Sequence, residues 1–167
     1  MCIRDRLNRD LDGVKEFSRK WLESGAISTG ILNWNYNQLM SLEKDAILLT
    51  QGDNDTYPSW MLQYAHSVRP DVKVININLL RQKKYCDAIL QENGIGSFPN
   101  SIDENITWKV DFTPLANHIF NESKRRPVYM NVAIPKSIRD NFSDKLYTVG
   151  LASVSYTHLT LPTICSV

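Results

Sequence analysis

The chain has 167 residues, of which 43% are hydrophobic, and it carries 19 Lys and Arg residues against 18 Asp and Glu residues. Because a nearly neutral chain has no electrostatic reason to bind nucleic acid or an anionic membrane surface, neither is expected as a direct partner. The length allows about one domain with one core. No run approaches the roughly 18 apolar residues that span a bilayer, so the chain is expected to be soluble as it stands.

Both ends of the chain resemble translated sequencing adapter. Residues 1–6 read as the transposase end sequence that is used to build DNA libraries, and residues 153–167 read as the same adapter from the other side. Such segments are set aside before a fold is inferred. We therefore expect a fragment, with an N-terminal helical segment at residues 7–44 and an α/β domain at residues 45–152.

Setting the ends aside changes the counts of charge and cysteine. Without Arg4, Arg6 and Asp5, the chain keeps 17 basic and 17 acidic residues, so the remainder is formally neutral. Cys86 is the one cysteine left. A single cysteine excludes an internal disulfide and a cysteine-based zinc site.

The first two expected elements are helices. Apolar residues recur at helical spacing from Leu11 to Leu22, and Gly25 ends this run. A second helical stretch follows, with the apolar residues Leu32, Tyr36, Leu39 and Met40.

A strand and a helix come next. The short apolar run at residues 46–50 predicts a buried strand. The pattern at residues 58–67 predicts a helix, with Asp55 or Thr56 as the N-cap and Pro58 in the first turn.

A second strand and helix follow directly. Residues 72–77 predict the strand, and residues 81–93 predict a helix that Gly94 closes. The strand, helix, strand, helix order over this part of the chain predicts a right-handed parallel unit.

The remainder of the chain is less regular. Residues 95–111 are rich in Gly, Pro, Asn and Ser and predict a surface connection, and residues 114–123 predict a helix. Residues 127–134 predict a third strand, and residues 146–149 predict a fourth. The expected fold is therefore α/β, with an open, mostly parallel, Rossmann-like sheet that is incomplete because the chain is a fragment.

The candidate site is the turn after the first strand, where Gly52, Asp53, Asn54, Asp55 and Thr56 stand in sequence. Ligands of open α/β sheets bind outside the carboxyl ends of strands, and this turn is expected there, at the start of a helix. A helix N-terminus would lower the pKa values of both carboxyl groups. The two carboxylates could hold a divalent cation, or one could act as a base. The alternative is that Asp and Asn only cap the helix.

Several other residues are weaker candidates. His66 near a helix end and His118 in a later helix are expected to pack or face solvent rather than to bind a ligand. Cys86 is expected to be a small buried residue. The basic run at residues 124–126 could attract a phosphate, although such a run is usually a solvated turn. Trp60, with Tyr57 and Tyr64, could stack on a sugar, although a packed helix face is the more common role.

Two segments resemble a known family. The stretch from Asp45 to Tyr64, which contains GDNDTYP, and the stretch from Val68 to Leu80 are similar to the extramembrane C-terminal region of a bacterial family of membrane proteins of unknown function. That family is grouped with GT-C protein O-mannosyltransferase-like enzymes. Residues 126–129 also resemble the family's later (K/R)RPIYF strand. The chain departs from the family after Leu80, where it reads RQKKY instead of an Asn-Thr-x-Trp-Tyr stretch.

The resemblance implies a function for the fragment. It implies a non-catalytic, extracytoplasmic (periplasmic) module of a membrane-bound, GT-C-like glycosyltransferase, which would meet the membrane through other parts of the parent. Its partners would be a glycan, a lipid-linked sugar or an acceptor protein, bound at the turn from Asp53 to Asp55. No cofactor is expected. The alternatives are a small metal-assisted hydrolase or transferase with Asp53 and Asp55 as ligands of a divalent cation, or a purely structural domain.

Overall fold

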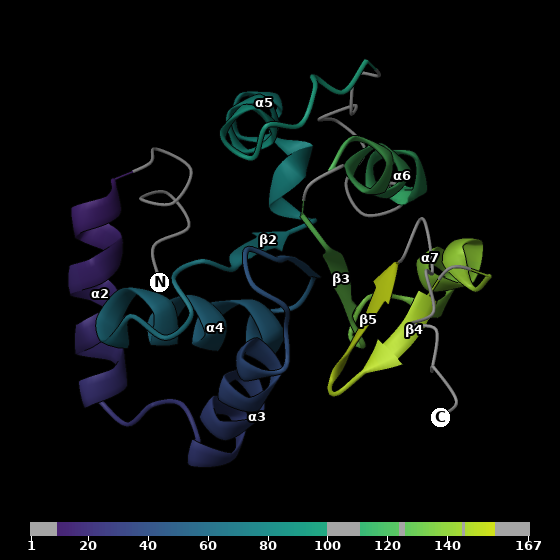
Figure 1. Cartoon of the computed structure of the whole chain (residues 1–167). Helices are drawn as coiled ribbons and strands as arrows, with labels where there is room; N and C mark the ends of the chain where they lie inside the picture. The colour runs from purple at the N-terminus through teal and green to yellow at the C-terminus, as the bar shows by residue number, and fades with distance from the viewer. Residues whose placement is uncertain (1–9, 100–110, 124–125, 145, 156–167) are drawn as a thin grey trace, which may run out of the picture.

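A computed structural model describes residues 10–99, 111–123, 126–144 and 146–155 of the chain. The expected adapter segment at residues 1–6 and most of the expected surface connection at residues 95–111 lie outside these residues, as do residues 156–167. The described part is an α/β fold with five strands and six α-helices (Figure 1).

The helices and strands alternate through the central part of the chain. In chain order they are α2 (Leu11–Glu23), α3 (Thr29–Met40), β1 (Ile47–Thr50), α4 (Asp53–His66), β2 (Lys73–Asn76), the 3-10 helix η1 (Leu79–Arg81), α5 (Lys83–Glu92), α6 (Thr113–Glu122), β3 (Val128–Asn131), α7 (Lys136–Arg139), the 3-10 helix η2 (Asp140–Phe142), β4 (Leu146–Val149) and β5 (Ala152–Ser155). Each expected helix and strand up to β4 is therefore present, with its bounds moved by a few residues.

The five strands form one sheet in the order β2-β1-β3-β5-β4. β1 pairs in parallel with β2 and with β3, so the predicted parallel arrangement of the first three strands is confirmed. β5 pairs antiparallel with both β3 and β4, which makes the sheet mixed rather than mostly parallel. The reason is the short turn at Gly150, because β4 and β5 form a hairpin that inserts its second strand beside β3. The expected domain boundary at residue 152 falls at the first residue of β5.

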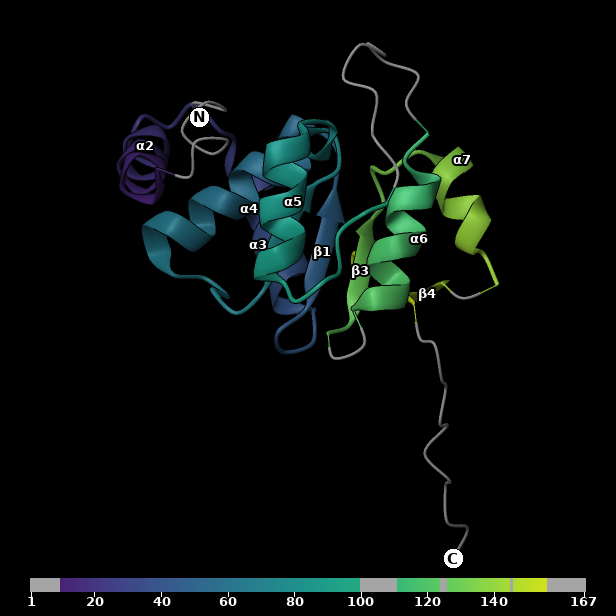
Figure 2. The same ribbon diagram turned by 90° about the horizontal axis from the view of Figure 1, so that it is seen from above.

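Helices cover both faces of the sheet (Figures 1 and 2). Alternate residues of β1 show this arrangement, since Ile47 and Leu49 pack under α5 and α6 while Leu48 packs against α3 and α4. Both side-chain sets are fully buried. Burial on two faces explains why the β1 sequence is a continuous apolar run and does not alternate.

α2 lies outside this three-layer arrangement and packs on α4. Its Trp21 ring lies 6.1 Å from the ring of Tyr57 on α4, and its Val14 is fully buried. The helix begins where the Asp10 carboxylate accepts a hydrogen bond from the N–H of Gly13. α3, in contrast, contributes Leu39 directly to the core beneath the sheet.

Two arginines hold together the edge of the sheet where the parallel strands begin. Arg69 donates to the carbonyls of Leu39 and Leu42 and forms a two-pronged ion pair with Asp71. This pairing holds the pKa of the Asp71 carboxyl well below its usual range. Arg126 donates to the carbonyls of Ala46 and Asp71. The arginines that carry part of the family resemblance are therefore structural residues.

Candidate functional site

The turn after β1 enters α4 earlier than the sequence pattern predicts. Gly52 is the N-cap and Asp53 the first helical residue, so the predicted N-cap at Asp55 or Thr56 is wrong. Asp55 instead reaches back from the third helical position, and its carboxylate accepts a hydrogen bond from the N–H of Gln51 at 3.0 Å. A carboxylate in this position satisfies a backbone donor that the helix leaves free.

Burial changes the pKa of the Asp55 carboxyl group in the direction opposite to the one expected. Its side chain is 6% exposed, and this burial raises the pKa of the carboxyl group above its usual value, although the N–H groups of Gln51 and Gly52 act in the opposite direction. The prediction that the helix N-terminus lowers this pKa is therefore wrong, because desolvation is the larger effect. Gly52 allows this close approach, since a Cβ there would stand 2.8 Å from Oδ1 of Asp55 and the carboxylate would have to shift.

Pro58 lies inside α4 and not in its first turn. A proline has no N–H, so it cannot bond the carbonyl of Asn54 four residues earlier. The side chain of Asn35 on α3 supplies the missing donor, with Nδ2 at 2.9 Å from that carbonyl oxygen. Ser59 donates to Oδ1 of the same Asn35 at 2.7 Å. Asn35 is fully buried and thereby fixes the position of the turn against α3.

Thr56 is the one predicted site residue that faces the core. It is fully buried, its hydroxyl donates to Oγ1 of Thr50 at 2.8 Å, and it accepts from the side-chain amide of Asn76 at 3.0 Å. This network joins the carboxyl ends of β1 and β2. Thr56 is therefore held in a satisfied structural network.

The other predicted residues line a pocket at the carboxyl end of the sheet. The pocket has a volume of about 590 Å³ and is lined by Gly30, Ile31 and Trp34 of α3, by Gly52, Asp53, Asn54 and Asp55 of the turn, and by Asn131, Val132 and Ala133 after β3. We call it the switch-point pocket, because it opens between β1 and β3. The connection from β1 to β2 runs through α4 on one face, and the connection from β2 to β3 runs through α5 and α6 on the other. Such a crevice is where open α/β sheets bind ligands.

The polar and apolar groups of this pocket stand side by side. The side chains of Asp53 and Asn54 are exposed. Trp34 and Val132 are large hydrophobic residues that nevertheless are 43% and 45% exposed. Asp53 also interacts with Tyr57, whose pKa is raised by burial first and then by the charge of Asp53 and a hydrogen bond with it. An exposed tryptophan beside acceptor groups is the composition of a site that takes a ligand with one apolar and one polar face.

A second amide of α3 holds the opposite wall of the pocket. Gln38 is fully buried; its Oε1 accepts from the side-chain amide of Asn131 at 2.9 Å, and its Nε2 donates to the carbonyl of Leu151. Sequence reasoning missed both amides and Trp34, because it placed the apolar face of this helix at Tyr36 and Met40. Those two side chains are 43% and 50% exposed. The available signal was the three-residue spacing of Asn35 and Gln38, which places both amides on one helix face.

The weaker candidates have structural positions. Trp60 is fully buried and its Nε1 donates to the carbonyl of Val74 at 3.1 Å, so it cannot stack on a ligand. Cys86 is buried as expected, and burial raises the pKa of its thiol to about 11. A ring nitrogen of His118 lies 2.7 Å from the carbonyl oxygen of Gly96. His66 is exposed in the last turn of α4.

Neither the basic run at residues 124–126 nor the carboxylates of the turn forms a ligand site of the expected kind in the described residues. Of residues 124–126, the first two lie outside the described residues, and Arg126 is bonded to backbone carbonyls at the edge of the sheet. Among residues 10–99, 111–123, 126–144 and 146–155, no group of three or more His, Cys, Asp or Glu side chains could hold a metal ion. Asp53 and Asp55 thus have no third ligand of this kind in the described part of the chain.

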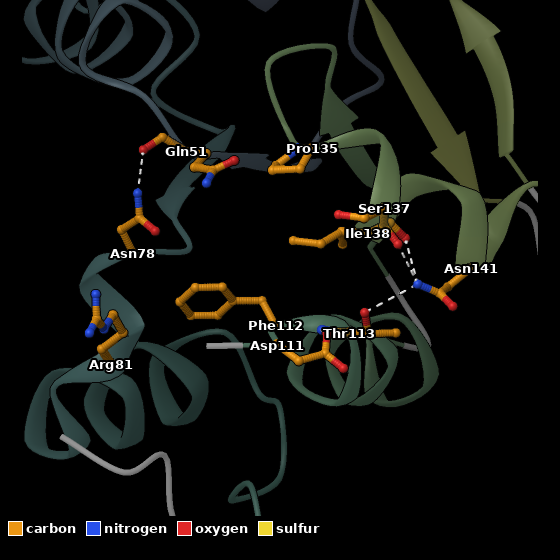
Figure 3. Close-up of a pocket in the computed structure, with 10 residues that line it drawn as sticks. All are labelled: Gln51, Asn78, Arg81, Asp111, Phe112, Thr113, Pro135, Ser137, Ile138 and Asn141. Carbon is orange, nitrogen blue, oxygen red and sulfur yellow. Dashed lines mark hydrogen bonds between the residues drawn. The ribbon is translucent and has the colours of Figure 1, made fainter. Parts of the chain in front are cut away.

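A second, larger pocket lies on the other side of β1. It has a volume of about 790 Å³ and is lined by Gln51, Asn78, Arg81, Asp111, Phe112, Thr113, Pro135, Ser137, Ile138 and Asn141 (Figure 3). We call it the amide pocket. It shares no lining residue with the switch-point pocket.

Comparison with known proteins finds a match to a family model. No curated protein and no solved structure matches the chain. None of the helices in the described ranges has the length and apolar character needed to cross a membrane. Residues 32–111, which include most of α3, the site turn and both strands β1 and β2, match the model of a family described as TMEM260-associated domain 2. This part of the chain is therefore similar to a domain family that is associated with a membrane protein.

Proposed function

We propose that the chain is a non-catalytic binding module that takes a sugar ring in the switch-point pocket. The observation that carries the proposal is the exposed indole of Trp34 beside the exposed side chains of Asp53 and Asn54. A sugar ring has an apolar face of C–H groups and a rim of hydroxyls. The first would pack on the indole, and the second would donate to the carboxylate and amide oxygens.

The shape of the pocket supports a binding role. Its walls come from three separate segments of the chain, and buried amides of α3 hold two of them in place. Its volume suits one or two sugar rings, since small-molecule sites usually measure about 300–1,000 Å³. Asp55 is buried and bonded to backbone, which leaves Asp53 as the exposed carboxylate of the turn. One exposed carboxylate provides recognition more readily than acid and base chemistry.

The proposal extends to the parent protein. The family resemblance suggests a Rossmann-like module, on the extracytoplasmic side, that belongs to a membrane-bound, GT-C-like glycosyltransferase. The match to a domain family associated with a membrane protein supports the membrane context. The sugar would then belong to a glycan, a lipid-linked sugar or a glycosylated acceptor protein, which share the same ring chemistry.

The test is a titration of isotope-labelled protein with mannose and N-acetylglucosamine, followed through the backbone N–H resonances of Asn54 and Val132, which every variant keeps, and in the unmodified chain also through the indole N–H of Trp34. We expect a saturable shift, which Trp34→Ala abolishes and Asp53→Asn weakens by about tenfold, the effect of about 1.4 kcal/mol in lost hydrogen bonding. Tyr36→Ala is the matched control, because Tyr36 lies on the same helix with the same 43% exposure. Asp12→Asn is the control for charge, because Asp12 is likewise in the first turn of a helix.

The outcomes separate the proposal from its alternatives. Sugar binding that survives Trp34→Ala as well as it survives Tyr36→Ala would place the ligand elsewhere. A rise in melting temperature with Mg²⁺ or Ca²⁺ that Asp55→Ala removes would instead support the metal-assisted enzyme. Neither effect in any variant would leave a structural domain.

A further inference from the structure

We propose that the amide pocket is a second ligand site, which takes a hydroxyl-rich ring. It lies at the carboxyl ends of β1 and β2, opposite α7 and the start of α6 (Figure 3). This inference does not depend on the function of the switch-point pocket, because the two pockets have separate linings.

The side chain of Gln51 gives the first observation. Its Oε1 is buried and has no hydrogen-bond partner among the described residues. A buried polar atom without a partner costs about 1–3 kcal/mol, so native proteins rarely keep one without a reason. The backbone of Gln51, in contrast, is fully used, since its N–H donates to Asp55 and its carbonyl accepts from Asn76 and Asn78. The backbone is thus anchored, and because Oε1 is itself buried, a ligand hydroxyl would meet the Gln51 amide through a rotation of this side chain.

Most of the polar side chains that line the pocket are uncharged. They are the amides of Gln51, Asn78 and Asn141 and the hydroxyls of Thr113 and Ser137, and the charged side chains of Arg81 and Asp111 line it as well. The NH₂ groups of Asn78 and Asn141 are already used, the first on the carbonyl of Gln51 and the second on Oγ1 of Thr113 and the carbonyl of Ser137. The amide oxygen of Asn78 then remains as an acceptor beside the pocket, whereas that of Asn141 points away from it in Figure 3. Acceptors require a ligand that donates, and a hydroxyl donates and accepts at once, so it fits an amide in either orientation.

The apolar lining supplies the complementary surface. The ring of Phe112 extends between Arg81 and Ile138 in Figure 3, and Pro135 lies across the space from it. Phe112 is 6% exposed, so its ring is fixed by the core beneath α6. Because little of this ring is exposed, it offers a ligand only a small apolar contact, beside the partly exposed Pro135. The volume of about 790 Å³ accommodates a hydroxyl-rich ring.

The test is a titration of isotope-labelled protein with glucose, mannose, galactose and N-acetylglucosamine, followed through the side-chain NH₂ resonances of Gln51, Asn78 and Asn141. At least one sugar is expected to shift all three in a saturable manner. Gln51→Met keeps the shape and removes the amide, and it is expected to weaken this binding by about tenfold or more. It should leave the melting temperature unchanged or higher, because it removes an unsatisfied polar group.

The controls separate this site from the first. Gln91→Met makes the same change at an exposed position of α5 and is expected to leave binding intact. Trp34→Ala is expected to leave the shifts of the amide pocket unchanged. The inference is overturned if no sugar shifts the three amides, if Gln51→Met binds as tightly as the unmodified chain, or if Trp34→Ala removes the shifts.

Discussion

The side-chain amide of Asn35 donates to the carbonyl of Asn54 at 2.9 Å, the same carbonyl that Pro58 leaves without its helical donor. A proline in the second turn of a helix would otherwise cost about 3 kcal/mol, partly through that lost bond. Here the free carbonyl of Asn54 accepts a hydrogen bond that attaches the site turn to α3. Asn35 on α3 therefore compensates for the hydrogen bond that Pro58 on α4 cannot make.

This relationship predicts a coupling between the two residues. Asn35→Ala should destabilise the fold by about 1–3 kcal/mol, because the carbonyl of Asn54 loses its donor and the buried Ser59 hydroxyl keeps only the carbonyl of Asp55 as an acceptor. In a Pro58→Ala background the cost should be smaller, because the new N–H bonds the carbonyl of Asn54 itself. Urea unfolding of the four proteins of this cycle measures the coupling. Equal costs in both backgrounds would contradict the relationship, and Asn37→Ala, at an exposed position of α3, controls for helix propensity.

A second prediction concerns the N-cap of α4. In Gly52→Ala the new Cβ would approach Oδ1 of Asp55 to 2.8 Å, so we expect the carboxylate to shift and its hydrogen bond with the N–H of Gln51 to weaken. We expect a loss of about 1–3 kcal/mol in the free energy of unfolding. Gly30→Ala is the matched control, because a Cβ there has open space and alanine favours a helix. Equal stability of the two variants would show that Asp55 does not hold the turn.

The ion pair of Arg69 and Asp71 predicts the response of the fold to acid. The pKa of Asp71 is lowered in the folded state, chiefly by its hydrogen bond with Arg69. As the pH falls, the unfolded chain therefore binds the proton first, and the stability that the pair contributes is lost below the usual pKa near 3.8. Thermal melts of Asp71→Asn between about pH 5 and pH 2 should show a shallower loss of stability than those of the unmodified chain. An identical acid profile would contradict the pairing.

The buried thiol predicts chemical inertness. Burial raises the pKa of Cys86 to about 11, so almost none of it is thiolate at neutral pH. Iodoacetamide at pH 8 should leave the peptide that contains Cys86 unmodified in the folded protein and should alkylate it in urea, as measured by mass spectrometry. Rapid labelling of this peptide in the folded state would contradict the burial.

Features that depend on neighbouring residues could be predicted from the sequence, whereas features that depend on contacts between distant segments could not. The apolar runs of β1, β2 and β3 and the helices between them are visible in the sequence, because burial on two faces leaves a continuous hydrophobic signal. The direction of β4 relative to the sheet was not predictable from its own residues, since it depends on the insertion of β5 beside β3. The start of α4 was misplaced because Pro58 usually marks a first turn, and only a residue 23 positions earlier makes it tolerable in the second.

The site shows the same division. The turn at residues 52–56 could be located from its place after a buried strand, yet the sequence did not reveal that Thr56 faces inward while Asp53 faces the pocket. Trp34 could not be assigned to the site from sequence, because nothing local indicates that α3 crosses the ends of two strands. The amide pocket was invisible for the same reason, as its lining comes from four separate segments.

The two buried amides of α3 carry a consequence for binding itself. Asn35 fixes the wall at Asn54, and Gln38 fixes the wall at Asn131, so the distance between the walls is set before any ligand arrives. The pocket is therefore preorganised, and binding of a ligand would cost little backbone conformational entropy. We expect such a pocket to select its ligand by size, because a wider pocket would require the hydrogen bonds of Asn35 and Gln38 to break. Substitutions at Trp34, Asp53 and Val132 could therefore change ligand specificity without disturbing the hydrogen bonds of Asn35 and Gln38.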